Sequence, residues 1–158
     1  MTDTPVSDLR DEIERIETAY EFLISFAGQG VGREAVQSPN DQVRKFVSQF
    51  EEALGAGFDA ATAVPDEHDQ FDTETYERFT ATMADEVEEA RTVLSLLGEQ
   101  DKITSRQADN LNGMSVFQSV LMKFFFLDEL TNHLERPDGD AEDADADADG
   151  VAADGSDA

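Results

Sequence analysis

Apolar residues recur every three or four positions along four long segments of the chain, which is the spacing of one face of an α-helix. In residues 5–27, successive apolar residues are separated by 4, 3, 4, 3 and 4 positions. Thr4 followed by Pro5 is a suitable cap and first helical residue. This heptad-like spacing predicts a helix with one continuous apolar seam. The seam consists of Leu9, Ile13, Ile16, Tyr20, Leu23 and Ala27.

The second segment begins with a cap serine, a proline and an early acid in residues 38–41, which favour a helix start. Gly55 and Gly57 weaken its end, although residues 58–64 can add another turn or two. We therefore predict a second helix whose last turns are uncertain in extent. Its apolar face contains Val43, Phe46, Val47, Phe50 and Leu54.

The third segment follows a polar loop, residues 63–72, and is bounded by recognisable signals at both ends. Asp72 is placed as an N-cap, and Gly98 is a natural C-terminal stop. These signals predict a third helix between them. Its apolar face contains Tyr76, Phe79, Met83, Val87, Ala90, Leu94 and Leu97.

The fourth segment opens with a T-x-x-Q capping box at residues 104–107 and stops before Pro137. We predict one helix over residues 104–134. It contains the stretch MSVFQSVLMKFFFLDEL, residues 114–130, whose apolar surface is wider than an ordinary face of about 100°. This stretch is too short for a membrane span, which needs about 20 apolar residues, and it lacks a basic face for anionic lipid.

The excess apolar surface of this fourth helix predicts that something covers it. Leaving large apolar side chains in water forgoes about 1.5–3 kcal/mol each, and strong salt increases that cost. The cover can come from the other helices, from another chain, or from a lipid or polymer surface. The residues assigned to partner binding are Val116, Met122, Phe125 and Phe126.

These four segments predict an all-α protein, either an antiparallel four-helix bundle or a helical-hairpin dimer. No segment shows the period-2 alternation of a strand. The helical domain spans residues 1–136. Residues 137–158 form an acidic, low-complexity tail without large apolar residues, for which we expect disorder.

The charge of the chain limits the environments and the classes of partner for which it is suited. Thirty-seven acidic residues against 11 basic ones give a net charge of -26, and cysteine is absent. Abundant acidic residues with few lysines resemble the composition of proteins from salt-accumulating archaea. In such proteins, concentrated salt screens the repulsion between surface carboxylates. So acidic a chain is poorly suited to nucleic acid. The absence of cysteine and of a signal-like N-terminus leads us to expect a cytoplasmic protein.

Candidate catalytic and metal-binding residues are few. The glycine-rich residues 27–32 follow a helix, whereas a phosphate-binding loop follows a strand. His68 and His133 are the two histidines, and Glu129 with His133 does not complete the paired motifs of a di-iron bundle. Adjacent acids in helices mostly face solvent, and catalytic carboxylates need a cleft that separates their pKa values. These pairs are Glu51-Glu52, Asp85-Glu86 and Glu88-Glu89. We assign no catalytic, cofactor-binding or metal-binding residue.

Together these features favour a non-enzymatic helical interaction protein of a halophilic archaeon, such as an adaptor, an accessory subunit or an assembly factor. It would dock on a protein partner or a second copy through the fourth helix. The alternative is a coat protein similar in general plan to phasins, the helical proteins that cover storage granules. A metal-dependent or hydrolytic helical enzyme is a third, weaker hypothesis.

Overall fold

The computed structural model describes residues 4–29 and 40–134, and this part of the chain consists of helices joined by short loops, without a strand. Five α-helices and one short 3₁₀ helix follow one another along it. Their bounds are α1 Pro5–Gln29, α2 Asn40–Ala63, η1 Val64–Asp66, α3 Thr73–Gly98, α4 Ser105–Asn112 and α5 Ser115–Thr131.

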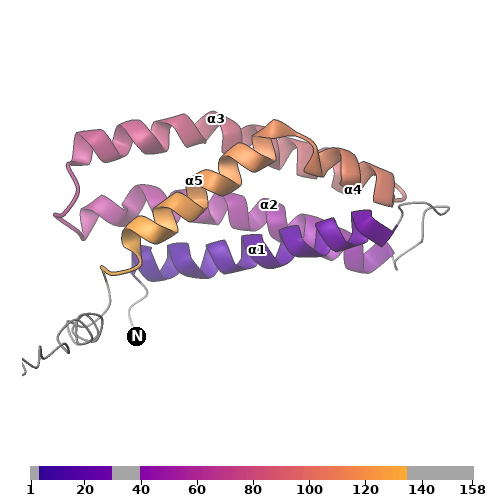
Figure 1. Cartoon of the computed structure of the whole chain (residues 1–158), viewed down its shortest axis with the longest axis horizontal. Coiled ribbons are helices and arrows are strands. Elements are labelled where there is room, and N and C mark those ends of the chain that lie inside the picture. The colour runs from indigo at the N-terminus through magenta and orange to yellow at the C-terminus, as the bar shows by residue number, and fades with distance from the viewer. Residues whose placement is uncertain (1–3, 30–39, 135–158) are drawn as a thin grey trace, which may run out of the picture.

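The long helices alternate in direction, and α4 and α5 together return along the bundle (Figure 1). The first three pack in sequence, α1 against α2 and α2 against α3. The last two divide their contacts, since α4 packs mainly on α1 whereas α5 packs on α3 and α1. In Figure 1, α5 therefore crosses the bundle diagonally, from α3 at its start toward α1 at its end.

One apolar core joins all five helices. The seam predicted for the first helix is confirmed, because its members are buried apart from the partly buried Tyr20. The stripe of α5 that faces inward is buried as well, as its apolar periodicity predicts. The largest fully buried side chains are Phe50, Phe117, Phe124, Leu9, Ile16, Leu23, Leu54, Met83, Leu94 and Leu127.

Side-chain caps fix three of the helix starts where the sequence predicts them. The Thr4 hydroxyl accepts a hydrogen bond from the Ser7 amide at 3.1 Å, and the Asp72 carboxylate accepts one from the Thr75 amide at 3.0 Å. Thr104 and Gln107 form both halves of the predicted capping box. These bonds satisfy amide groups that a helix leaves unpaired at its first turn.

The α2 helix passes through both glycines without interruption and extends to Ala63, so the further turns allowed for residues 58–64 are formed. Close packing explains why glycine occurs here. A Cβ on Gly57 would lie 3.1 Å from Cε1 of Phe124, and one on Gly55 would lie 2.9 Å from Cζ of Arg91. The glycines let an α5 ring and an α3 guanidinium approach the α2 backbone.

The prediction of one continuous helix over residues 104–134 is wrong, because the structure has a break between α4 and α5. Gly113 caps α4, and its amide donates to the carbonyls of Asp109 and Asn110. Met114 then adopts an extended conformation, with φ -76° and ψ 126°, as the residue before α5. The break lets α4 lie on α1 while α5 turns toward α3, so each buries its own apolar stripe.

Some expectations lie outside the described residues. They concern the acidic tail at 137–158, the later glycines of residues 27–32, and the cap serine and proline at 38 and 39. Among the helices of the described part, none has the length and apolar character needed to cross a bilayer.

Candidate docking surface

Two large apolar side chains of α5 point away from the core. Met122 is 66% exposed and Phe126 is 51% exposed, and they lie one helical turn apart on the outer side of the helix. The described helices therefore leave them uncovered. With Phe79 of α3, they form a surface that we call the α5 ridge.

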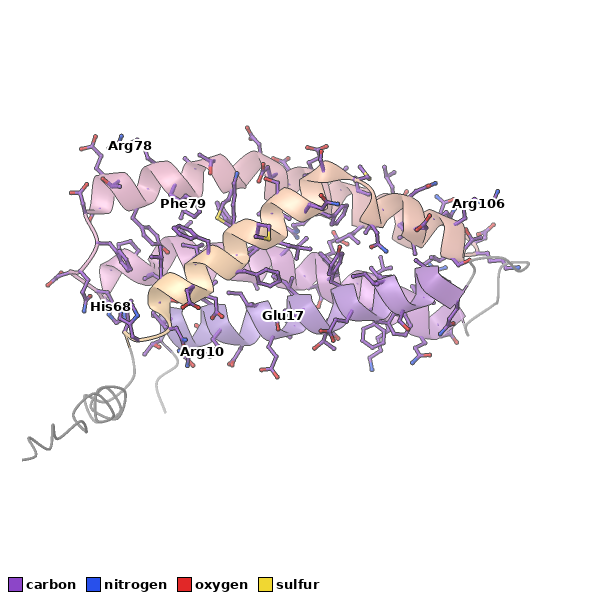
Figure 2. The ribbon with its side chains drawn as sticks, viewed as in Figure 1. Arg10, Glu17, His68, Arg78, Phe79 and Arg106 are labelled. Atoms are coloured by element: carbon purple, nitrogen blue, oxygen red, sulfur yellow. The ribbon has the colours of Figure 1, made fainter. Side chains whose placement is uncertain are left out.

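Phe79, which Figure 2 labels on α3, joins the ridge because its ring contacts that of Phe126 on α5. The ring centroids are 5.3 Å apart and the planes are inclined by 62°, an edge-to-face arrangement that aromatic pairs favour. Phe79 is itself half-buried against the core. The contact supports one side of the Phe126 ring and leaves the other side open to solvent.

An ionic cluster follows the ridge along the line where α3 and α5 meet. Glu86 of α3 accepts hydrogen bonds from the Lys123 ammonium group at 3.0 Å and from the Ser119 hydroxyl at 2.8 Å. The side chains of Lys123 and Glu86 are 26% and 27% exposed, so the pair is less screened by water than a pair on an open surface. Both carboxylate oxygens are used, which fixes the register of α5 against α3.

An apolar groove of about 360 Å³ lies beyond this cluster, beside the break between α4 and α5. The last turns of α3, the end of α4 and Met114 form its walls. Leu96 stands at its edge and is 57% exposed. Every lining residue is uncharged: Val93, Leu96, Leu97, Gln100, Gln107, Asn110, Leu111 and Met114. We call this feature the α3/α4 groove.

The four residues assigned to partner binding have different surroundings in the structure. Met122 and Phe126 are exposed, as a docking site requires. Phe125 is half-buried and packs against the core from the other side of α5. Val116 is only 8% exposed, because the chain's own helices cover it. The structure thus brings Met122 and Phe126 together and separates Val116 from them.

The two histidines lie outside the ridge and are 65 residues apart in the sequence. His68 is half-buried in the loop before α3, and His133 is exposed just after α5. Figure 2 shows His68 at the end of the bundle where α2 finishes. Within residues 4–29 and 40–134, no three His, Asp or Glu side chains are grouped as metal ligands.

Three acids from the adjacent acidic pairs, Glu51, Glu52 and Glu88, line an open groove of about 770 Å³ between α2 and α3. Glu52, Glu88 and Glu99 are exposed in it, as expected for solvated carboxylates on helix surfaces. Arg91 crosses the groove and reaches the backbone at Gly55. Glu86 differs from the other acids, because it belongs to the ionic cluster between α3 and α5.

Like charges crowd the opposite edge of α5, where it meets α1. Partial burial and the neighbouring carboxylates of Asp128, Glu21 and Glu14 raise the pKa of Glu17 above its ordinary value. Glu17 lies on α1 and Asp128 on α5, so the repulsion acts between helices as well as within α1. Only the α3 side of α5 therefore combines apolar exposure with a favourable ion pair among the described residues.

Two parts of this surface were missed by the sequence analysis. Phe79 was assigned to the buried face of its helix, although it lies at the edge of that face. Leu96 stands next to two buried leucines and fell outside the predicted face. An off-face leucine is a usable signal of exposure. The groove itself had no signal, since it depends on the break at Gly113.

In comparisons with protein-family models, with curated proteins and with solved structures, no match to the chain was found.

Proposed function

We propose that this protein is a non-enzymatic helical interaction protein, an adaptor, accessory subunit or assembly factor, that docks a protein partner on the α5 ridge. The observation that supports this proposal is the exposure of Met122 and Phe126 on a helix whose opposite stripe is fully engaged in the core. Because both side chains are already partly covered, burial of the remainder of each by a partner would contribute about 1–2 kcal/mol.

The form of the ridge favours a protein partner over a broad apolar surface such as a storage granule. The ridge is narrow, and Gln118 and Glu129 border it on α5. A granule coat needs a wide apolar face along a helix, whereas a protein interface needs a small apolar centre with a polar rim. The granule alternative predicts that the protein floats with granules on fractionation of cells.

The acidic surface favours a salt-rich cytoplasm, like that of halophilic archaea, as the environment in which the protein works. Partial burial and repulsion from nearby carboxylates raise the pKa of Glu17, and at about 1 M salt the Debye length falls to about 3 Å. Concentrated salt would relieve such repulsion and strengthen apolar association at the ridge. The proposed docking is therefore expected to be strongest in high salt.

We also infer that α4 and α5 together act as the fourth arm of an antiparallel four-helix bundle. The alternating directions of α1, α2 and α3, with α4 and α5 returning together, support this description (Figure 1). In such an arrangement the break in the last arm places the α5 ridge on the outside of the bundle.

The test is affinity capture of the full chain from its native lysate at high salt, followed by mass spectrometry. The Met122→Gln and Phe126→Gln variants should lose a partner that the unaltered chain retains. Ile24→Gln is the matched control, because Ile24 is 45% exposed on α1 and lies outside the ridge. Retention of every captured protein by the Met122→Gln/Phe126→Gln double variant would reject docking at the ridge.

A further inference from the structure

Three half-buried residues of α3 repeat at intervals of seven along its line of contact with α5 and α4. They are Phe79, Glu86 and Val93, and an interval of seven returns to nearly the same side of a helix. Phe79 contacts Phe126, Glu86 binds Lys123, and Val93 lines the α3/α4 groove. The ridge, the ionic cluster and the groove are therefore successive parts of one line.

The residues opposite this line run in the reverse order, from Phe126 through Lys123 and Ser119 to Met114. The result is a surface with three layers, apolar at each end and ionic in the middle. From Phe79 to Val93 is 14 residues, or about 21 Å at the rise of an α-helix. We call this surface the α3/α5 seam, and its length suits one helix of about four turns.

The middle layer has an excess of negative charge. Glu86 is paired with Lys123, while Glu89 is exposed one turn further along the same side of α3. This side of α3 thus carries two carboxylates for the one ammonium group of α5 that pairs with it. A second copy of this chain would bring the same excess against itself, on top of a net charge of -26. A cation would instead be attracted to this layer.

We infer that the occupant of the α3/α5 seam is an α-helix of another protein, with apolar residues 14 positions apart and a lysine or arginine midway between them. This inference rests on the proposed function and specifies the partner's chemistry. One apolar end lies on Met122 and Phe126, and the other enters the α3/α4 groove beside Leu96. The central cation meets Glu86 and Glu89, which fixes the register of the partner helix.

Two matched synthetic helical peptides test the inference directly on the full chain. Both carry leucine clusters separated by 14 residues, and the residue midway is lysine in one and glutamate in the other. Fluorescence anisotropy measures their affinities at about 1 M salt, where apolar docking is expected to be strongest and the Debye length of about 3 Å still permits direct ion contacts. The lysine peptide should bind about tenfold more tightly, because attraction is replaced by repulsion in the other. Equal affinities, or no binding of the lysine peptide, would overturn the inference.

Three variants test the contributions of the apolar and ionic layers of the α3/α5 seam separately. Leu96→Gln should weaken the lysine peptide about tenfold, through lost burial in the groove. Glu89→Lys should reverse the preference between the two peptides, whereas Ile24→Gln on α1 should change neither affinity. An unchanged affinity in Leu96→Gln, or an unchanged preference in Glu89→Lys, would contradict a helix lying along the whole seam.

The same variants distinguish failure of this inference from failure of the proposed function. If captured partners are lost with Phe126→Gln but kept with both Leu96→Gln and Glu89→Lys, docking at the ridge stands and the partner helix along the seam is rejected. Light scattering adds a further check on the occupant. A stable dimer that Glu89→Lys strengthens and that excludes the lysine peptide would show that a second copy covers the seam.

Discussion

The ring of Phe126 on α5 stands edge-on to the ring of Phe79 on α3, with the centroids 5.3 Å apart. The contact holds an exposed phenylalanine in a defined position at the edge of the core. Freely moving surface side chains lose conformational entropy when a partner orders them, at about 0.5–1.5 kcal/mol each. A ring that already packs on one side loses less conformational entropy on binding. Phe126 is therefore preorganised for contact on its open side.

The ridge should be dispensable for folding. We expect Met122→Gln to change the free energy of unfolding by no more than about 0.5 kcal/mol, as for most surface substitutions. Phe126→Gln should lower it by about 0.5–1.5 kcal/mol, because the ring contact with Phe79 is lost. Phe124→Ala, two positions before Phe126, should cost about 3–5 kcal/mol because Phe124 is fully buried. Denaturant unfolding in high salt measures these changes. A large loss of stability in Met122→Gln would assign that residue to the core instead.

Arg44 should stabilise the C-terminal end of α3 from α2. Its guanidinium donates to the carbonyl oxygen of Gly98, which the end of α3 leaves without an intrahelical partner, and, at 2.7 Å, to that of Gln100 just after the helix. Arg44→Ala should therefore lower the free energy of unfolding by about 1–2 kcal/mol. Arg78→Ala is the control, because Arg78 is exposed on α3, and it should have little effect. Equal effects would exclude a capping role for Arg44.

Tyr76 should contribute to stability through one buried hydrogen bond. Its hydroxyl donates to the carbonyl of Ala61 at 2.6 Å, and Pro65, four positions after Ala61, has no amide hydrogen to offer that carbonyl. Tyr76→Phe should cost about 1–2 kcal/mol, since a buried acceptor loses its partner. Thermal unfolding checks this, and an unchanged midpoint would contradict it.

The same tyrosine predicts a loss of stability in strong alkali. Burial raises the pKa of Tyr76 to about 12, from 10.0. A raised folded-state pKa gives a contribution that is complete below pH 10.0 and declines as the pH rises through about 12. Ultraviolet titration should show a tyrosine step near pH 12 that Tyr76→Phe removes. A step near pH 10 alone would show that the hydroxyl is open to solvent.

Glu17 should destabilise the fold at neutral pH and low salt. Burial and the carboxylates of Asp128, Glu21 and Glu14 raise its pKa, so the penalty is absent at low pH and develops as the pH rises through the folded-state pKa. Glu17→Gln should raise the free energy of unfolding at pH 7 and about 0.1 M salt, and the gain should shrink at about 1 M salt. Urea unfolding at both salt concentrations measures it.

Glu89→Gln, an exposed acid on α3, provides the comparison for Glu17→Gln. Both variants remove one negative charge, so any shared gain reflects net charge alone. A larger gain in Glu17→Gln at low salt identifies the local repulsion. Equal gains at every salt concentration would contradict a specific contact between α1 and α5.

Much of the fold follows from local signals in the sequence. Heptad-like spacing fixed the seam of α1, and Asp72 and Thr104 marked helix starts because their side chains satisfy exposed amide groups. Gly55 and Gly57 were read as weak points since glycine is unfavourable within helices. Glycine occurs at these two positions because of tertiary packing: Phe124 and Arg91 approach the α2 backbone there. No local signal carries that information.

The candidate site could be predicted only in part. The breadth of apolar surface on residues 114–130 pointed to Met122 and Phe126, which the structure leaves exposed. The prediction of one helix over residues 104–134 took no account of Gly113, where the structure ends α4. Without the break, the rotation of α5 relative to α4 is lost, and so are the α3/α4 groove and the burial of Val116. The pairing of Glu86 with Lys123, 37 residues apart, likewise depends on that rotation.

Oxidation of Met122 is the most direct measure of whether the ridge is covered in the native assembly. The purified chain and intact cells would be treated with peroxide, and methionine sulfoxide would be quantified by mass spectrometry at Met122 and at Met83. Met83 is fully buried and serves as the internal reference, because susceptibility follows exposure. We predict rapid oxidation of Met122 in the purified chain and strong protection in cells. Oxidation of Met122 at the same rate in both settings would contradict the docking role of the α5 ridge.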